Sequence, residues 1–145
     1  MNAPRLSTEN VHATTVAKAG RAVMITGASG AGKSDLGLRL IDNGFTLVSD
    51  DRTILKRQGE TLLAAAPATI AGKIEVRGIG ILDVEHVDDV PVAMIVELAS
   101  ELQRMPDEDR TRIFLGVRLP LIGVDAMTPS AAAKVAIALG CLGRN

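Results

Sequence analysis

Short apolar runs alternate with polar breaks along the first part of the chain, and they predict strands and one helix. Residues 11–17 alternate roughly and are rich in β-branched side chains, which favours a strand. Residues 21–26 form a compact apolar run that suits a buried strand. Leu36 and Leu40 fall on one face of a helix predicted over residues 33–43.

The rest of the chain continues in short apolar runs. Residues 101–112 are charged and predict a solvated linker or mobile segment with some helix, whereas residues 113–124 are apolar. Pro120 lies inside that apolar stretch and favours an edge strand or a bend. A final helix is predicted over residues 129–139, ended by Gly140. Further strands are expected over residues 46–49, 53–56, 61–65, 81–84 and 92–98.

This order of elements predicts one α/β domain with a mixed sheet and flanking helices. The chain has 145 residues, which is enough for one hydrophobic core. Residues 1–10 are polar and predict a flexible N-terminal arm, so the domain is expected over residues 11–145.

A glycine-rich segment between the second predicted strand and the first helix matches the pattern G-x-x-x-x-G-K-[ST]. Its glycines let the backbone turn successive N–H groups toward phosphate oxygens, at a helix N-terminus that attracts anions. In this pattern the lysine reaches the β- and γ-phosphates and the serine hydroxyl meets Mg²⁺. The predicted nucleotide-binding residues are Gly27, Ala28, Ser29, Gly30, Ala31, Gly32, Lys33 and Ser34.

Two acidic residues, Asp50 and Asp51, end the next predicted strand. A strand, helix and parallel strand in succession bring both strand ends to one edge of the sheet, which places this pair beside the P-loop. Adjacent strand residues point to opposite faces, so one carboxylate is expected to accept a hydroxyl proton while the other holds Mg²⁺. A turn-forming pair of aspartates remains the alternative.

Three further residues are candidates for the site. If residues 18–20 form a three-residue hairpin loop, His12 faces Thr26 just before the P-loop, but a shift of one residue turns it away. Glu75 and Arg77 flank one residue and share a face of an extended chain, where a surface ion pair is the simpler interpretation.

The amino-acid composition argues against nucleic-acid and membrane partners. The formal net charge is −1, and the chain has two Phe, no Trp and no Tyr. A basic groove and aromatic stacking platforms are therefore missing, so no nucleic-acid partner is expected. No apolar run approaches the length of a membrane span, and the N-terminus lacks the apolar core of a signal peptide. With one cysteine, Cys141, the chain is expected to be cytoplasmic.

Four segments together resemble the HPr kinase/phosphorylase family, and the likeness covers roughly residues 11–98. The resemblance implies a P-loop domain of the phosphoenolpyruvate carboxykinase-like type. It implies ATP-dependent phosphorylation of a serine in the phosphocarrier protein HPr, removal of that phosphate by phosphorolysis, and a hexamer. The segments are His12, the P-loop, Leu47-Val48-Ser49-Asp50-Asp51-Arg52 and residues 74–84.

By the same resemblance, Asp50 is the catalytic acid and base, and His12, Lys33 and Arg77 line the active site. Mg²⁺ is then bound by Ser34 and Glu75, with Asp51 in support. The assignment of Glu75 comes from the resemblance alone.

The chain departs from the family pattern in three places. It starts at the catalytic domain, like the short form expected in alphaproteobacteria. Residues 121–128 contain no arginine where the family has an arginine-asparagine loop important for dephosphorylation, which puts the phosphorylase activity and the hexamer in question. Asp35 stands where the family commonly has glutamate.

Two alternatives stay open from the sequence. One is a small-molecule kinase of the shikimate-kinase type, with Arg104, Arg110 and Arg112 as a lid. The other is a nucleotide-sensing module that transfers no phosphate and does not need Asp50.

Overall fold

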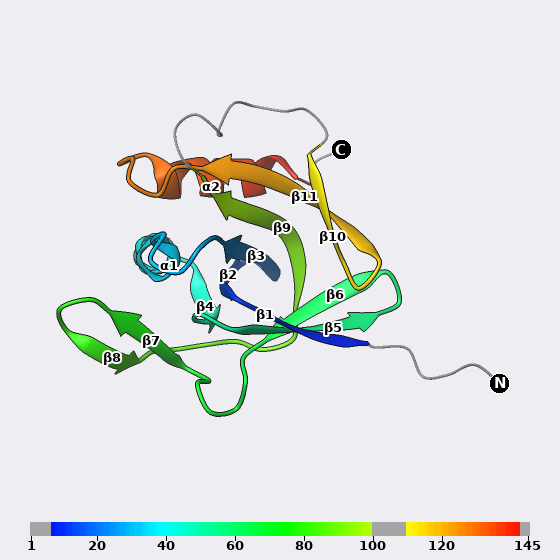
Figure 1. Cartoon of the computed structure of the whole chain (residues 1–145), viewed down its shortest axis with the longest axis horizontal. Helices are drawn as coiled ribbons and strands as arrows, with labels where there is room; N and C mark the ends of the chain where they lie inside the picture. The colour runs from blue at the N-terminus through cyan, green and yellow to red at the C-terminus, as the bar shows by residue number, and fades with distance from the viewer. Residues whose placement is uncertain (1–6, 100–109, 143–145) are drawn as a thin grey trace.

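A computed structural model describes residues 7–99 and 110–142, which contain eleven strands and two helices (Figure 1). In chain order the elements are β1 (Thr8–Val11), β2 (Ala13–Lys18), β3 (Arg21–Thr26), α1 (Lys33–Asp42), β4 (Thr46–Ser49), β5 (Thr53–Gln58), β6 (Thr61–Ala65), β7 (Lys73–Val76), β8 (Gly80–Asp83), β9 (Val90–Leu98), β10 (Thr111–Phe114), β11 (Val117–Val124) and α2 (Ala131–Cys141).

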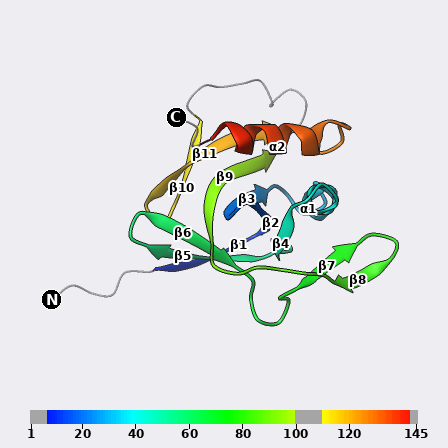
Figure 2. The same ribbon diagram turned by 180° about the vertical axis from the view of Figure 1, so that it is seen from behind.

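Nine of these strands form one mixed sheet in the order β1-β5-β6-β9-β3-β2-β4. Strand β9 pairs in parallel with β3 along one edge. Along its other edge, the first residues of β9 pair with β6 in antiparallel, and the last residues pair with β11 in parallel. Strand β10 joins as the antiparallel partner of β11. Strands β7 and β8 form a separate two-stranded hairpin that projects beside α1 in both views (Figures 1 and 2). The expected mixed α/β sheet is confirmed.

Two hydrophobic clusters pack on opposite faces of the central strands. On one face Val23 and Ile25 of β3 pack against Leu36 and Leu40 of α1, together with residues of α2. On the other face Met24 of β3 belongs to a cluster covered by the β5–β6 and β10–β11 hairpins. Strand β3 is thus buried on both faces, as its continuous apolar run predicts, and the P-loop follows directly at its end.

The register of the first hairpin differs from the prediction by one residue. Ala19 and Gly20 form a two-residue turn, Lys18 faces Arg21, and Ala13 rather than His12 faces Thr26. Ala19 adopts a φ of 54°, the left-handed conformation that such turns require and that alanine rarely adopts. His12 lies in a bend that separates β1 from β2.

Strands β3 and β4 point the same way, as the crossover predicts, but they are not neighbours. Strand β2 lies between them and is antiparallel to both. The aspartate pair still lies beside the P-loop as expected, but one strand separates β4 from the P-loop strand. The hairpin that precedes the P-loop supplies the intervening strand.

The chain ends also differ in detail. Residues 8–10 belong to β1, which pairs with β5, so the predicted arm over residues 1–10 is too long; its first six residues lie outside the described part. Residues 113–124 contain parts of two strands and a turn rather than one strand. Gly140 lies inside α2 instead of ending it. Of the predicted linker, residues 101–109 lie outside the described part and Thr111 begins β10.

Candidate functional site

The P-loop joins the buried end of β3 to the first turn of α1. Gly30 and Gly32 adopt φ values of 82° and 102°, which only glycine adopts without strain. The Leu36 N–H bonds to the Gly32 carbonyl, so the helix begins directly after the loop. A loop of this shape at a helix N-terminus favours an anion.

Lys33 folds back over this loop. Its Nζ donates to the carbonyl oxygens of Gly27 at 3.0 Å and Ala28 at 3.1 Å, and the residue is buried. The ammonium group is thus fixed next to the loop interior, close to where phosphate oxygens would lie.

Asp50 lies beneath the P-loop. Its Oδ1 accepts hydrogen bonds from Ser34 Oγ at 2.6 Å and Thr14 Oγ1 at 2.9 Å, and its Oδ2 accepts from the Glu75 N–H at 3.0 Å. The side chain is buried and does not line the cleft. The resemblance implied that Asp50 is the catalytic acid and base; in the structure, groups from three neighbouring elements already occupy both of its oxygens.

Asp51 lies in the cleft instead. It is exposed, it lines the same cavity as the P-loop, and its φ is 68°. Its N–H donates to Thr14 Oγ1 at 3.1 Å, which holds this uncommon conformation. Non-glycine residues with positive φ cost free energy and gather at functional sites. The two aspartates differ in direction as predicted, Asp50 buried and Asp51 exposed, but they lie in a bend after β4 rather than in the strand.

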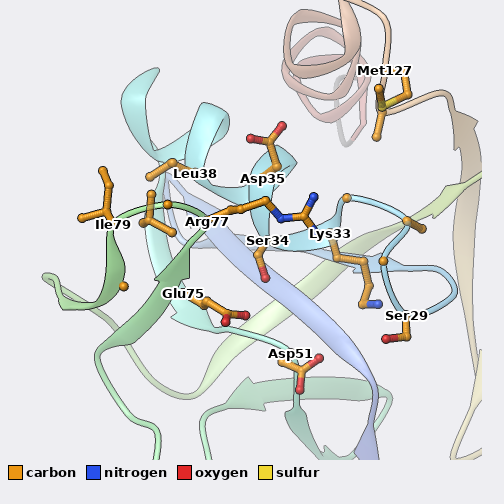
Figure 3. A pocket seen from close by; sticks show the side chains of 17 residues that line it. Ser29, Lys33, Ser34, Asp35, Leu38, Asp51, Glu75, Arg77, Ile79 and Met127 are labelled. Carbon is orange, nitrogen blue, oxygen red and sulfur yellow. The ribbon is translucent and has the colours of Figure 1, made fainter.

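The β7–β8 hairpin brings Glu75 and Arg77 to the opposite wall. Both side chains are exposed and line the cleft. Figure 3 shows the Arg77 side chain reaching across the cleft toward the start of α1, and the Glu75 carboxylate lying below Ser34. The turn between the two strands contains Gly78, and a Cβ placed there would meet no atom within 4 Å.

The two walls enclose a cleft of about 750 Å³. Ala126 and Met127, which follow β11, close it on a third side. Its lining residues are Ser29–Asp35, Leu38, Asp51, Glu75–Gly80, Ala126 and Met127. A cavity of this size accepts a nucleoside triphosphate.

The oxygen donors in the cleft suit Mg²⁺. Ser34 Oγ and the carboxylates of Asp51 and Glu75 face the same space, and a hydroxyl that donates to Asp50 still has lone pairs for a cation. Within residues 7–99 and 110–142, no cluster of three or more His, Cys, Asp or Glu side chains forms a metal cage. Mg²⁺ does not need such a cage, because phosphate oxygens and water complete its shell.

His12 lies outside this cleft. It lines a smaller pocket of about 310 Å³ with Val11, Thr26, Gly27, Glu97 and Arg112. The pocket adjoins the first glycine of the P-loop. Of the alternative lid residues, Arg110 pairs with Glu97 and Arg112 contacts Thr26, so neither lines the cleft, and Arg104 lies outside the described residues.

Thr14 and Arg39 are parts of the site that the sequence did not indicate. Thr14 connects to both aspartates, and Arg39 fastens α1 to the segment after β11. No motif or spacing marks either residue, since each acts through a contact with a distant part of the chain.

Comparison with known proteins agrees with this geometry. The model of the HPr Serine kinase C-terminal domain matches residues 5–138. The HPr kinase/phosphorylase of Levilactobacillus brevis is 35% identical over 133 residues, which cover 83% of this chain and 43% of that protein. That of Prosthecochloris aestuarii is 35% identical over 127 residues, with 79% and 37% covered. The chain thus spans less than half the length of these curated relatives.

A solved structure extends the likeness to three dimensions. The Hpr(Ser) kinase/phosphatase from Coxiella burnetii superposes with a TM-score of 0.80 at 30% sequence identity. The match covers 91% of this chain and 94% of that chain. Within the described residues, neither helix is long and apolar enough to cross a membrane.

Proposed function

We propose that this chain, which belongs to the HPr serine kinase C-terminal domain family, transfers the γ-phosphoryl group of ATP to a serine of an HPr-type phosphocarrier protein. One observation carries the proposal: Lys33, Asp51, Glu75 and Arg77 line a single cleft around the P-loop. Relatives named HPr kinase/phosphorylase support the choice of acceptor.

The chemistry follows from the positions of these groups. The P-loop amides and Lys33 hold the β- and γ-phosphate oxygens in line with the entering hydroxyl. The seryl oxygen forms a bond to the γ-phosphorus, the bond to the bridging β-γ oxygen breaks, and ADP leaves. Arg77 offsets the negative charge on the transferred group.

We assign the proton acceptor to Asp51 rather than Asp50. The exposed Asp51 carboxylate borders the cleft, whereas both Asp50 oxygens already accept hydrogen bonds. Asp50 then orients Ser34 through their 2.6 Å contact. Mg²⁺, held by Ser34 and Glu75, supplies charge neutralisation on the phosphates when bound. This reverses the roles that the sequence resemblance suggested for the two aspartates.

His12 receives a role on the acceptor side. Its pocket adjoins Gly27 but lies outside the cleft. His12→Ala should therefore raise the KM for HPr and leave the KM for ATP unchanged. An effect on the KM for ATP alone would contradict this assignment.

The wider setting is proposed from the family. We place the protein in the cytoplasm, where HPr and ATP occur, and we propose a homo-oligomer, a hexamer by resemblance. We propose transfer to serine as the main direction and phosphorolysis, in which phosphate takes the phosphoryl group to give pyrophosphate, as the reverse. The missing arginine in residues 121–128 should make that reverse reaction slow.

The test uses γ-labelled ATP, Mg²⁺ and purified HPr. Wild type should label HPr, and Asp51→Asn should lower the rate about 10²-fold or more, as removal of a proton-transfer group typically does. Asp42→Asn, the same change at the exposed end of α1, serves as the control and should keep the wild-type rate.

Other outcomes would point elsewhere. Turnover of ATP with a small hydroxyl compound but not with HPr would favour the small-molecule kinase. Binding of ATP without transfer to any hydroxyl would favour the sensor. A wild-type rate for Asp51→Asn would contradict the assignment of the proton acceptor.

A further inference from the structure

Arg39 fastens the P-loop helix to the segment between β11 and α2. Its Nη2 donates to the Ala126 carbonyl at 2.6 Å and its Nη1 to the Thr128 carbonyl at 3.3 Å. Its Nε donates to Asp35 Oδ2 at 3.1 Å on the same helix. We call this set of contacts the Arg39 clamp. A guanidinium group spreads its donors over three nitrogen atoms in a planar fork, so it reaches three separated acceptors at once, whereas an ammonium group donates from a single nitrogen.

The clamped segment forms one side of the cleft. Ala126 and Met127 line it, and a Cβ placed on Gly32 would lie 3.3 Å from the Ala126 Cβ, so the segment packs against the last P-loop glycine. Asp125 shapes the segment internally by accepting the Met127 and Thr128 N–H groups. The Arg39 clamp sets where this small folded unit lies relative to the loop that takes the phosphates.

This side of the cleft is suited to the nucleoside rather than to the phosphates. The P-loop amides and Lys33 serve the phosphates, and Leu38 and Met127 offer apolar surface next to them. In Figure 3 these two side chains lie on either side of Asp35. The described lining has no aromatic residue to stack on a base, so aliphatic and thioether contacts must do that work.

The Arg39 clamp also offsets the negative charge of Asp35 in the lining of the cleft. Asp35 lines the cleft, with 70% of its side chain exposed, and its carboxylate would repel a polyphosphate. Pairing with Arg39 offsets that charge. This charge effect changes the affinity for every polyphosphate ligand equally, with or without a nucleoside. A ligand without a nucleoside therefore separates it from the effect of Arg39 on the position of Ala126 and Met127.

We propose that Arg39 is a positioning residue for nucleoside recognition: it holds the Ala126–Met127 wall against the P-loop so that the base and ribose meet a preformed surface. The inference rests on the proposed function, in which the P-loop binds ATP. Without the clamp, ATP must order the segment itself, and that ordering lowers affinity.

The test compares two ligands with the same phosphates. Dissociation constants for MgATP and for magnesium tripolyphosphate are measured by calorimetry on wild type, Arg39→Ala, Arg39→Lys and Met127→Ala. The ratio of the ATP constant to the tripolyphosphate constant should rise on the order of tenfold in Arg39→Ala. Arg39→Lys, which keeps the charge beside Asp35, should still raise the ratio, and so should Met127→Ala.

Arg57 provides a matched control. It makes three comparable contacts, to the carbonyls of Gly59 and Leu115 and to the Glu60 carboxylate, at hairpins remote from the cleft. Arg57→Ala should lower stability but leave the ratio at its wild-type value.

The outcomes separate this inference from the proposed function. Wild type that binds neither ligand would overturn the nucleotide site itself. Equal loss of both ligands in Arg39→Ala and an unchanged ratio in Arg39→Lys would overturn the clamp's role in nucleoside recognition while leaving the phosphate site intact. An unchanged ratio in Met127→Ala would overturn the wall as the contact surface.

Discussion

The P-loop wall of the cleft is built into the main sheet, whereas the opposite wall is a two-stranded hairpin whose second strand is exposed at every position. On the P-loop side, β3 is buried on both faces, and Lys33 and Ser34 already have hydrogen-bond partners. On the hairpin side, Glu75 and Arg77 are exposed.

This contrast indicates different roles for the two walls of the cleft. In the proposed reaction, phosphates meet a surface whose side chains already have hydrogen-bond partners, which suits electrostatic stabilisation. The hairpin groups depend on few contacts, so they can adjust to ligand and acceptor. Asp50 connects the two walls, because one oxygen bonds to Ser34 and the other to the Glu75 backbone.

Removing that connection should have the largest effect on stability. Asp50→Ala leaves Thr14, Ser34 and the Glu75 N–H without their acceptor, and the free energy of unfolding should fall by about 3 kcal/mol. Urea unfolding measures this change. Asp51→Ala should stay within about 0.5 kcal/mol of wild type, since its side chain is exposed. Equal losses in the two variants would contradict the difference between these residues.

The hairpin wall should instead lose activity without losing stability. Arg77→Ala should slow transfer to HPr about 10²-fold, because the change removes the cation that the proposed mechanism uses to offset charge on the transferred phosphoryl group. Its unfolding midpoint should match wild type, because the side chain is exposed. Arg118→Ala, an exposed arginine on β11, is the control for both measurements. A drop in the midpoint of Arg77→Ala would show that the hairpin wall carries more stability than its contacts indicate.

The same substitution in each wall sharpens the comparison. In Gly37→Ala the new Cβ would lie 2.8 Å from the buried Thr14 Cγ2, and the overpacking should cost about 2 kcal/mol in spite of alanine's higher helix propensity. In Gly78→Ala the Cβ meets no atom within 4 Å, and only the φ of 86° opposes it, at about 1 kcal/mol. Thermal unfolding should rank them in that order, and the reverse order would place the tighter packing in the hairpin.

The smallest expected effect is a gain. Asp51 has a φ of 68°, so Asp51→Gly should relieve strain and raise stability by about 0.5 kcal/mol while abolishing transfer. Calorimetric melting and the labelling assay measure the two effects. A less stable Asp51→Gly would mean that the carboxylate contributes contacts beyond its backbone N–H bond to Thr14.

Features coded by adjacent residues were predictable from the sequence. The P-loop needs a strand, glycines and a helix start in immediate succession, and all three are visible between Arg21 and Ser34. Strand alternation predicted opposite directions for Asp50 and Asp51, but both residues lie in a bend after β4, and the φ of 68° at Asp51 is what separates them. Which of them faces the cleft could not be predicted, because that depends on Thr14 and on the Glu75 backbone, both distant in sequence.

The register error has an equally local cause. Two-residue hairpin turns are recognised by Asn-Gly or Asp-Gly, and Ala19-Gly20 lacks that signal although Ala19 adopts the required positive φ. Because Lys18 belongs to β2 and not to the loop, the register shifts by one residue, and Ala13 instead of His12 lies opposite Thr26. The position of β2 between β3 and β4 was not predicted for another reason. The order of strands along the chain does not show whether β4 pairs with β3 or with β2, since both arrangements have the same sequence of elements.

The segment after β11 that holds Ala126 follows Gly32, against which it packs, by about two thirds of the chain length. Residues 126–127 leave the ribosome long after the P-loop, so a partly synthesised chain lacks the proposed nucleoside wall. Contacts of such long sequence separation form late in folding. If the wall acts as proposed, only chains extended past residue 127 retain nucleotide tightly.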